Sequence, residues 1–291
     1  MKLERRGILI TGASQGLGKA IAEACLMEGA NIVICARDPL LLAAAQAELG
    51  LQARAGQQVL ALSADVSKPD DVMNLVEFAL KNLPRIDGLI NNAGAYGPKG
   101  LIEEVDLQEW LRAIEINLVG TALLCRAVLP VFRKQNYGKI VNLSGGGATA
   151  PLPRFSAYAA SKAAVVRLTE TMAEETRDCG INVNAVAPGP LNTRLLDEVL
   201  EAGPEKVGNA FYEQALEQKK HGGAPLEKSA ALCVFLVSND SDGITGRLIS
   251  AVWDPWDTFA ERVTEFDGTD IYTLRRIVPK DRGLEWSKTK T

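Results

Sequence analysis

The sequence has few of the residues that bind metals or cross-link chains. Its 291 residues include one histidine, His221, and five cysteines that stand singly, without a Cys-x-x-Cys spacing. Zinc sites are built mainly from histidine and closely spaced cysteine, and disulfide frameworks need paired cysteines. We therefore expect no metal centre and no disulfide scaffold, and a reducing cytoplasm as the location.

Basic charge and long apolar runs are also scarce. The 36 Asp and Glu residues outnumber the 32 Lys and Arg residues, which gives a formal net charge of −4. Nucleic-acid binding needs a basic face, and a membrane-spanning helix needs about 20 apolar residues in a row. No run in the sequence approaches that length, and the charged N-terminus lacks the apolar core of a signal peptide. We expect neither a nucleic-acid nor a membrane partner.

Short apolar runs alternate with longer amphipathic ones along most of the chain. Uninterrupted apolar strands that are separated by helices are typical of a parallel sheet covered on both faces. The expected strands are residues 7–11, 31–36, 58–63, 87–91, 139–144, 181–187 and 247–252. The expected helices are residues 17–28, 40–53, 70–81, 107–134, 157–178 and 227–237. The sequence therefore predicts an α/β protein with a doubly wound parallel sheet.

Residues 255–291 break this alternation. They contain five aromatic residues, Trp256, Phe259, Phe266, Tyr272 and Trp286, which is unusual for a disordered tail. We expect residues 1–254 to form one Rossmann-type domain. Residues 255–291 should form an ordered extension on that domain or on a neighbouring subunit, with only residues 287–291 frayed.

A glycine-rich turn follows the first expected strand and opens the first expected helix. It reads Thr-Gly-Ala-Ser-Gln-Gly-Leu-Gly from Thr11 to Gly18. Its glycines permit a tight turn, a close approach of backbone N–H groups to a pyrophosphate, and close packing of the helix on the sheet. Glycines also serve plain tight turns, but the strand–turn–helix context favours nucleotide binding. The expected contacts are Gly12, Ser14, Gln15, Gly16, Leu17 and Gly18.

Arg37 follows the second expected strand. In dinucleotide-binding folds an arginine near this point accommodates the 2′-phosphate of NADP, whereas an acid holds the ribose of NAD. Arg37 is better placed than Asp38, so NADP(H) is favoured over NAD(H). The alternative is that Arg37 is a solvated loop charge.

Further cofactor contacts are expected after the third and fourth strands. Asp65, beside Val66, is able to accept from an adenine amino group or to cap a helix. Asn91, Ala93 and Gly94 lie at the carboxyl edge of the sheet, where ligands bind, and otherwise form an ordinary turn.

Tyr158 and Lys162 are four residues apart and so share one face of an expected helix. A lysine ammonium beside a phenol stabilises the phenolate and lowers its pKa from about 10. Such a tyrosine exchanges a proton with a carbonyl or alcohol oxygen near neutral pH. By itself the spacing is common in exposed helix pairs, and the surrounding segments favour the chemical interpretation.

Taken together, the ordered motifs resemble the short-chain dehydrogenase/reductase family. They are the glycine turn, residues 91–94, Asn117, Tyr158 with Lys162, Pro188-Gly189 and Thr193, and their order and spacing fit residues 7–254. The resemblance implies a seven-stranded sheet and hydride transfer between a nicotinamide and a small carbonyl or alcohol substrate. It also implies a homodimer or homotetramer, built partly through helices 107–134 and 157–178.

The resemblance also implies roles for single residues. Tyr158 would be the acid/base, and Lys162 its electrostatic partner and a ribose ligand. Asn117 would hold a water of the proton relay. The nicotinamide end would be contacted by Pro188, Gly189 and Thr193. Residues 194–225 would form a lid over the substrate.

Gly145 departs from the family pattern. The fifth strand of the family usually ends in two serines, the second of which orients the substrate oxygen, and here it ends in Ser144 and Gly145. Either Ser144 or the backbone N–H groups of residues 145–147 hold that oxygen, or the substrate supplies its own hydroxyl, as a polyol would. The third alternative is a non-catalytic NADP-binding sensor or scaffold. Because Tyr158, Lys162 and Asn117 occur together, the sequence favours the first two.

The substrate side is less well defined by the sequence. Arg154 and Phe155 precede Tyr158 and are possible substrate contacts. The lid is basic and partly aromatic, which would suit an anionic substrate, although a solvated amphipathic helix is the favoured interpretation. The residues concerned are Arg194, Phe211, Tyr212, Lys219, Lys220 and His221.

Overall fold

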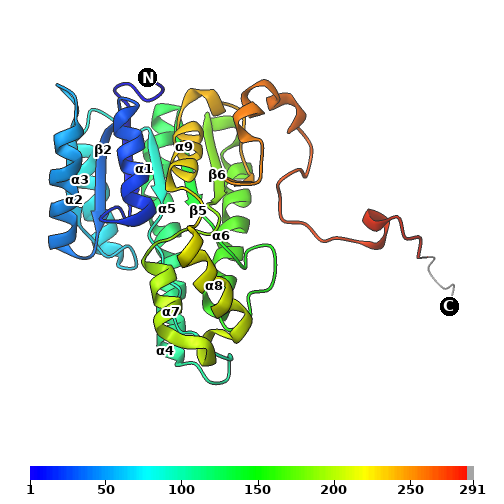
Figure 1. The fold of residues 1–291 in the computed structure, drawn as a ribbon. Helices are drawn as coiled ribbons and strands as arrows, with labels where there is room; N and C mark the ends of the chain where they lie inside the picture. The colour runs from blue at the N-terminus through cyan, green and yellow to red at the C-terminus, as the bar shows by residue number, and fades with distance from the viewer. Residues whose placement is uncertain (287–291) are drawn as a thin grey trace.

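A parallel sheet of seven strands runs through the centre of the computed structural model, which describes residues 1–286 (Figure 1). The strand order is β3-β2-β1-β4-β5-β6-β7, so the chain winds outward from β1 in both directions. The strands are β1 (Gly7–Thr11), β2 (Asn31–Ala36), β3 (Val59–Ser63), β4 (Gly88–Asn91), β5 (Gly138–Leu143), β6 (Ile181–Ala187) and β7 (Leu248–Ser250). The predicted class and the seven-stranded, doubly wound sheet are confirmed.

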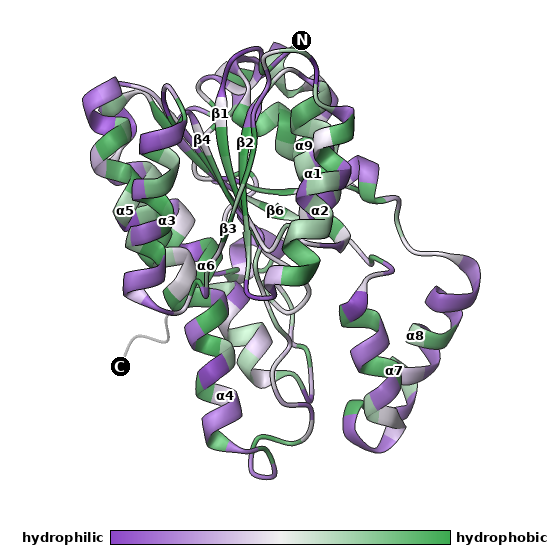
Figure 2. Cartoon of the chain, turned by 90° about the vertical axis from the view of Figure 1, so that its left-hand side faces the viewer, coloured by the Kyte–Doolittle hydropathy of each residue, from purple (hydrophilic) through white to green (hydrophobic). Residues whose placement is uncertain are grey.

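Helices cover both faces of the sheet (Figures 1 and 2). One face carries α1 (Gly16–Met27), α2 (Pro39–Gln52) and α9 (Leu226–Val237), and the other carries α3 (Pro69–Asn82), α5 (Gly120–Gln135) and α6 (Ser156–Glu175). Within β1, Ile8 and Ile10 pack in one hydrophobic cluster and Leu9 packs in the other. Because both faces of β1 and β2 are buried, these two strands read as nearly continuous apolar runs.

The starts of two helices show where the polar residues before them bind. Asp106 accepts a hydrogen bond from the Glu109 N–H at 2.9 Å and so caps α4 (Leu107–Ile114). Pro69 is the first residue of α3, but Ser67 does not cap it, because the Ser67 hydroxyl donates to Asp65 at 2.7 Å. Ser67 thus belongs to the polar loop after β3.

The helix expected over residues 107–134 is continuous but changes its winding once. A π-helical turn, η1 (Glu115–Val119), joins α4 to α5. Contrary to the expectation from the sequence, the combined helix Leu107–Gln135 is long and apolar enough to cross a membrane by length and composition. Leu124, Val128 and Phe132 of this helix are buried against the sheet. Packing in the core therefore accounts for part of its apolar character.

The extension after residue 254 has two parts. The first contains the short helices η4 (Trp256–Glu261) and η5 (Val263–Glu265), and its Phe259 and Phe266 are buried in the core that contains α1 and α9. The second part, which includes η6 (Pro279–Arg282), leads away from the sheet, and Trp286 is 78 % exposed (Figure 1). The expected fraying of residues 287–291 lies outside the described residues.

The extension, together with Asp254 just before it, covers the outer edge of β7, the last strand of the sheet. The Tyr272 carbonyl of the extension accepts from the Leu248 N–H at 2.8 Å, and Asp254 accepts from the Ser250 N–H at 2.6 Å. The Arg247 guanidinium donates to the carbonyls of Thr269, Ile271 and Phe266. These bonds fasten the chain to the edge strand.

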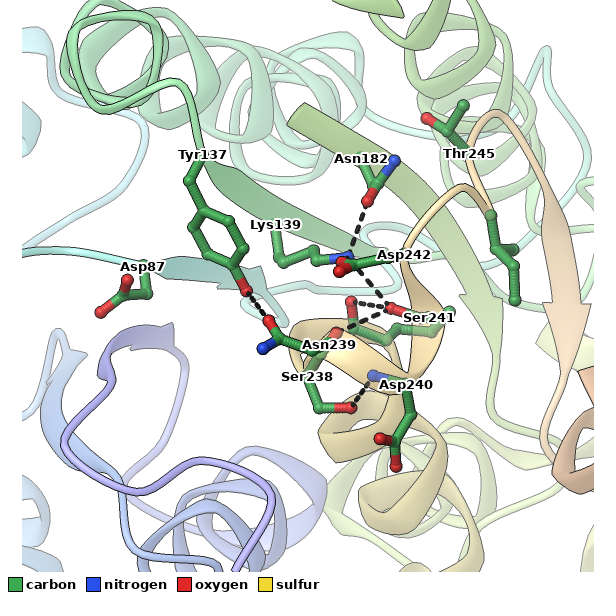
Figure 3. Close-up of polar contacts among 12 residues, drawn as sticks. Asp87, Tyr137, Lys139, Asn182, Ser238, Asn239, Asp240, Ser241, Asp242 and Thr245 are labelled. Carbon is green, nitrogen blue, oxygen red and sulfur yellow. Dashed lines mark hydrogen bonds and ion pairs between the residues drawn. The ribbon is translucent and has the colours of Figure 1, made fainter. Parts of the chain in front are cut away.

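A polar cluster closes the amino ends of the strands (Figure 3). Lys139, near the start of β5, is fully buried, and its Nζ donates to Asn182 at 2.6 Å, to Asp242 at 2.5 Å and to Ser241 at 3.4 Å. Burial lowers the pKa of Lys139, although Asp242 opposes this shift. The cluster ties β5 and β6 to the loop after α9.

Candidate active site

A cleft of about 970 Å³ opens at the carboxyl ends of the strands. It contains most of the residues that the sequence singles out, from the glycine turn to the lid. Those that line it are Gly12, Ser14, Gln15, Gly16, Leu17, Gly18, Arg37, Asp65, Val66, Ala93, Gly94, Ser144, Tyr158, Lys162, Pro188, Gly189 and Thr193. Asn91 and Asn117 do not line it.

The glycine turn is shaped by close approaches that a side chain would prevent. Gly12 has a φ of +64°, and a Cβ there would lie 2.8 Å from the Ala93 Cα. A Cβ on Gly18 would lie 2.2 Å from the Gly12 carbonyl oxygen. Asn92, within the 91–94 motif, donates from its amide to the carbonyls of Thr11 and Gly12 at 2.9 and 3.1 Å, a role the sequence did not indicate. The turn is held open at the N-terminus of α1, a position that favours an anionic ligand.

Arg37 and Asp38 have different surroundings at the edge of this cleft. Asp38 caps α2 by accepting from the N–H groups of Leu40 and Leu41 at 2.9 and 3.0 Å. The Arg37 side chain is exposed and makes no hydrogen bond or ion pair within residues 1–286. The cation therefore has its donors available to a ligand, whereas the neighbouring carboxylate is engaged by a helix.

Asp65 is also engaged by the protein. Its carboxylate accepts from the backbone and hydroxyl of Ser67 and pairs with Arg112. Burial opposes ionisation of Asp65, but Ser67 and Arg112 outweigh it and lower the pKa of that carboxyl. This geometry favours a structural role for Asp65 in the loop after β3 over a contact with adenine. The adenine contact stays a prediction, and so does a cofactor contact through Val66.

The predicted contact of Asn91 with a cofactor is not supported by its position. The Asn91 amide donates to Asn142 at 2.9 Å in the core, and the residue is 4 % exposed. Asn91, the last residue of β4, faces the core, where its amide also lies 3.4 Å from the Cys125 Sγ of α5. The chain reaches the cleft only afterwards, at Ala93 and Gly94.

Asn117 joins two parts of the site from the π-helical turn. Its amide donates to the Ala95 carbonyl at 2.8 Å and to Ser161 at 3.0 Å, and its oxygen accepts from the Ala95 N–H at 2.9 Å. Asn117 thus holds the chain after β4 against α6. Its predicted contact with a relay water stays a prediction.

Tyr158 and Lys162 share a face of α6, as their spacing indicates, but the expected pKa shift of the tyrosine is wrong for this state. Burial, and secondarily Tyr96, raises the pKa of Tyr158. The Lys162 Nζ lies 5.7 Å from the Tyr158 ring centre and donates to the Leu143 carbonyl at 2.7 Å. Burial lowers the pKa of Lys162 to about 8. Loss of hydration therefore dominates, and Tyr158 is protonated and able to donate.

Gly145 makes room for the Tyr158 hydroxyl. A Cβ on Gly145 would lie 2.2 Å from that oxygen, which is closer than any real contact. Beside it, the Ser144 hydroxyl is buried and has no hydrogen-bond partner among the described residues. An orphaned buried hydroxyl is costly unless something binds it. The serine missing at position 145 would thus collide with the tyrosine unless the tyrosine moved.

The lid consists of α7 (Arg194–Val207) and α8 (Asn209–His221), which Figure 2 shows as a pair beside the sheet. Arg154 was expected near the substrate, but it donates to the Glu205 carbonyl at 2.9 Å and so fastens the lid. Phe155 is fully buried beneath the cleft wall. Tyr96, which the sequence analysis missed, packs edge-on against Tyr158 with ring centres 4.7 Å apart.

Comparisons with known proteins agree with this geometry. A family model described as short chain dehydrogenase matches residues 6–203. Glucose 1-dehydrogenase 2 of Bacillus subtilis (strain 168) is 33 % identical over 241 residues, which cover 82 % of this chain and 90 % of that protein. Levodione reductase of Leifsonia aquatica is 33 % identical over 248 residues, which cover 84 % and 91 %.

Solved structures give the same result. The crystal structure of a levodione reductase has a TM-score of 0.78 and 31 % identity, and the match covers 85 % of this chain and 96 % of that one. An NAD⁺-bound xylitol dehydrogenase has a TM-score of 0.77 and 25 % identity, and covers 86 % and 98 %. These relatives are named dehydrogenases or reductases, so the sensor or scaffold alternative finds no support.

Proposed function

We propose that this chain, which belongs to the short-chain dehydrogenase family and is an NAD(P)-dependent oxidoreductase, reduces or oxidises a small carbonyl/alcohol pair through Tyr158. The observation that carries this proposal is the meeting of Tyr158, Lys162 and Ser144 in one cleft with the glycine turn. The nicotinamide, when bound, supplies or accepts the hydride. In reduction Tyr158 donates its proton to the carbonyl oxygen, and in oxidation it takes the proton back.

The glycine turn and Lys162 would hold the cofactor. The N–H groups at the start of α1, with Gly12, Ser14, Gln15, Gly16, Leu17 and Gly18 around them, suit a pyrophosphate. Lys162 has two N–H donors beyond its bond to the Leu143 carbonyl, and these suit ribose hydroxyls. We assign contacts near the nicotinamide to Ala93, Gly94, Pro188, Gly189 and Thr193, which line the same cleft.

Ser144 is the proposed second donor to the substrate oxygen. Its hydroxyl is buried at the end of β5 and lacks a protein partner among the described residues. Removing a comparable donor in other enzymes costs about 2–4 kcal/mol of transition-state stabilisation. The N–H groups of residues 145–147 are the alternative donors.

Replacement of the tyrosine tests this function. Tyr158→Phe should lower kcat/KM for carbonyl reduction by about 10²- to 10⁴-fold, because the acid is lost. NADPH binding, followed by fluorescence, should persist. Unchanged turnover in this variant would remove Tyr158 from the mechanism.

The preferred cofactor is proposed to be NADP(H), because Arg37 is exposed and unpaired within residues 1–286 while Asp38 caps a helix. Arg37→Ala should weaken NADPH binding by about 10- to 100-fold, as expected for one charged hydrogen bond, and leave NADH binding unchanged. Arg54→Ala, at another exposed arginine outside the cleft, is the control. An equal loss for both nucleotides would refute the assignment.

We further propose a cytoplasmic homodimer or homotetramer. The helix Leu107–Gln135 exposes Leu111 and Val119, which are 41 % and 40 % exposed, on the side away from the core. Light scattering with size-exclusion chromatography measures the state, and a monomer at micromolar concentration would contradict the proposal.

A further inference from the structure

The wall of the cleft beside Tyr158 is apolar and aromatic. It receives side chains from separate parts of the chain: Tyr96 after β4, Leu152 after β5, Val199 in α7 and Phe211 in α8. Phe155, beneath them, packs against Tyr96 and Phe211 with ring centres 5.1 and 4.9 Å apart. Aromatic walls of this kind bind ring-shaped apolar groups by offset or edge-on contact.

The charges near this wall are paired with one another. Arg194 is the charged lid residue that lines the cleft, and it contacts Glu198 at 3.3 Å. Glu198 also contacts Lys99 at 3.6 Å. The other cleft-lining charges, Arg37, Asp38, Asp65 and Lys162, lie at the nucleotide end or on α6. A charged substrate group here would lose its hydration, and the lid cation that lines the cleft, Arg194, already pairs with Glu198.

Polar side chains are few at this end of the cleft. The lining includes Thr149, Gln214 and Gln218, and the Gln218 amide already donates to Asn192 at 3.1 Å. A polyol presents hydroxyls along its whole length, and each one buried without a partner costs free energy. The wall therefore also disfavours a substrate that supplies its own hydroxyl at Gly145.

We propose that the substrate is an uncharged, mainly apolar ketone or secondary alcohol that carries a ring, and that the ring packs on Tyr96 and Phe211. This inference rests on the proposed hydride transfer, which places the reacting carbon next to Tyr158. Phe211 is a specificity-determining residue, because it contacts the ring and not the reacting oxygen.

Three probes separate the classes of substrate. Phenylacetone and phenylpyruvate share an aromatic ring and a ketone but differ by a carboxylate, and glucose represents the polyols. With NADPH for the ketones and NADP⁺ for glucose, kcat/KM for phenylacetone should exceed both others by about tenfold or more, as buried-charge and hydroxyl mismatches do elsewhere. Phenylacetone binding to the NADP⁺-loaded protein is measured by calorimetry beside turnover.

A pair of lid variants tests the wall. Phe211→Ala should raise KM for phenylacetone and weaken its binding by about tenfold, with a smaller change in kcat. Leu216→Ala, on the same helix but 44 % exposed and outside the cleft, should change neither. Weaker phenylacetone binding in both variants, or in neither, would overturn the role of Phe211.

The outcomes distinguish this inference from the function on which it rests. Equal or faster turnover of phenylpyruvate or glucose overturns the substrate class and leaves hydride transfer intact. Phe211-dependent binding of phenylacetone without turnover of any probe supports the ligand class and overturns hydride transfer. Absence of both binding and turnover overturns both.

Discussion

Two buried lysines meet opposite ends of β5, and their surroundings differ. Lys139, at the amino end, donates to Asn182, Ser241 and Asp242. Lys162, at the carboxyl end, donates within residues 1–286 to the Leu143 carbonyl alone. Burial lowers the pKa of both ammonium groups. A lysine has three N–H donors, so the first is fully satisfied by protein and the second is not.

The difference separates a structural lysine from one available to a ligand. A buried ammonium with a carboxylate and two other acceptors fixes the elements around it. A buried ammonium without a carboxylate partner destabilises the folded protein, and such a group is typical of sites where a ligand supplies the missing acceptors. The carboxyl end also contains the unpartnered Ser144 hydroxyl. The polar groups at the amino end of β5 thus have all their hydrogen bonds within the protein, whereas those at its carboxyl end have hydrogen-bonding capacity left for a ligand.

The largest expected effect is the loss of Lys162. Lys162→Met should lower kcat/KM by about 10²- to 10⁴-fold, the range for proton-transfer groups. Thermal stability should hold or rise, because a poorly compensated buried charge is removed. Turnover with NADPH and the unfolding midpoint Tm measure the two effects.

Lys139→Met should produce the opposite pattern. Turnover per folded molecule should be unchanged, while the free energy of unfolding falls by about 1–3 kcal/mol because Asn182 and Ser241 lose a buried donor. Urea denaturation measures the loss. If both lysine variants lost turnover alike, the distinction between the two ends of β5 would collapse.

Gly145→Ser tests whether the carboxyl end of β5 needs a glycine beside Tyr158. The new Cβ would overlap the Tyr158 hydroxyl, so the tyrosine has to move, and we expect kcat/KM to fall by about tenfold or more. Gly146→Ser is the matched comparison, since its Cβ meets nothing closer than Leu152 at 4.0 Å, and its loss should be smaller. Higher activity in Gly145→Ser would show that the site lacks only the serine hydroxyl.

The smallest effect is a pH dependence of stability. Lys162 titrates near 8 in the folded protein and near 10.5 when unfolded, because burial disfavours the ammonium. The unfolded chain therefore holds more protons between these values, and the contribution of Lys162 to stability rises with pH across that window. Denaturation of the wild type and Lys162→Met, below and inside the window, should show the stability deficit of the wild type shrinking as the pH rises. A constant difference would mean that Lys162 is not perturbed.

Local sequence patterns were sufficient for the elements and for residues whose role is set by the backbone. The glycine turn was predictable because its function depends on missing side chains next to a strand. The position of Asn91 was not, because the last residue of a strand faces either a ligand or the core, and its partner Asn142 lies far along the chain. The bond of Arg154 to the lid was hidden for a similar reason, since its partner Glu205 lies far along the chain.

Neither the raised pKa of Tyr158 nor the packing of Tyr96 could be predicted from the sequence. The spacing of Tyr158 and Lys162 indicated a shared helix face, but not that both groups would be buried without a hydrogen bond between them. Tyr96 follows a small-residue segment that gives no signal of an aromatic wall. Its packing on Phe155 and Tyr158 brings together segments that only the fold makes neighbours.

The cover over β7 has a consequence for the behaviour of the protein in solution. An uncovered edge strand presents a row of free N–H groups on which another extended chain is able to assemble. Here the Leu248 and Ser250 donors are taken by Tyr272 and Asp254 of the same chain. The extension therefore helps to prevent a second chain from pairing with the edge of β7. A chain cut after residue 254 would keep Asp254 but expose the Leu248 donor. We expect it to aggregate through the edge of β7 before it loses activity.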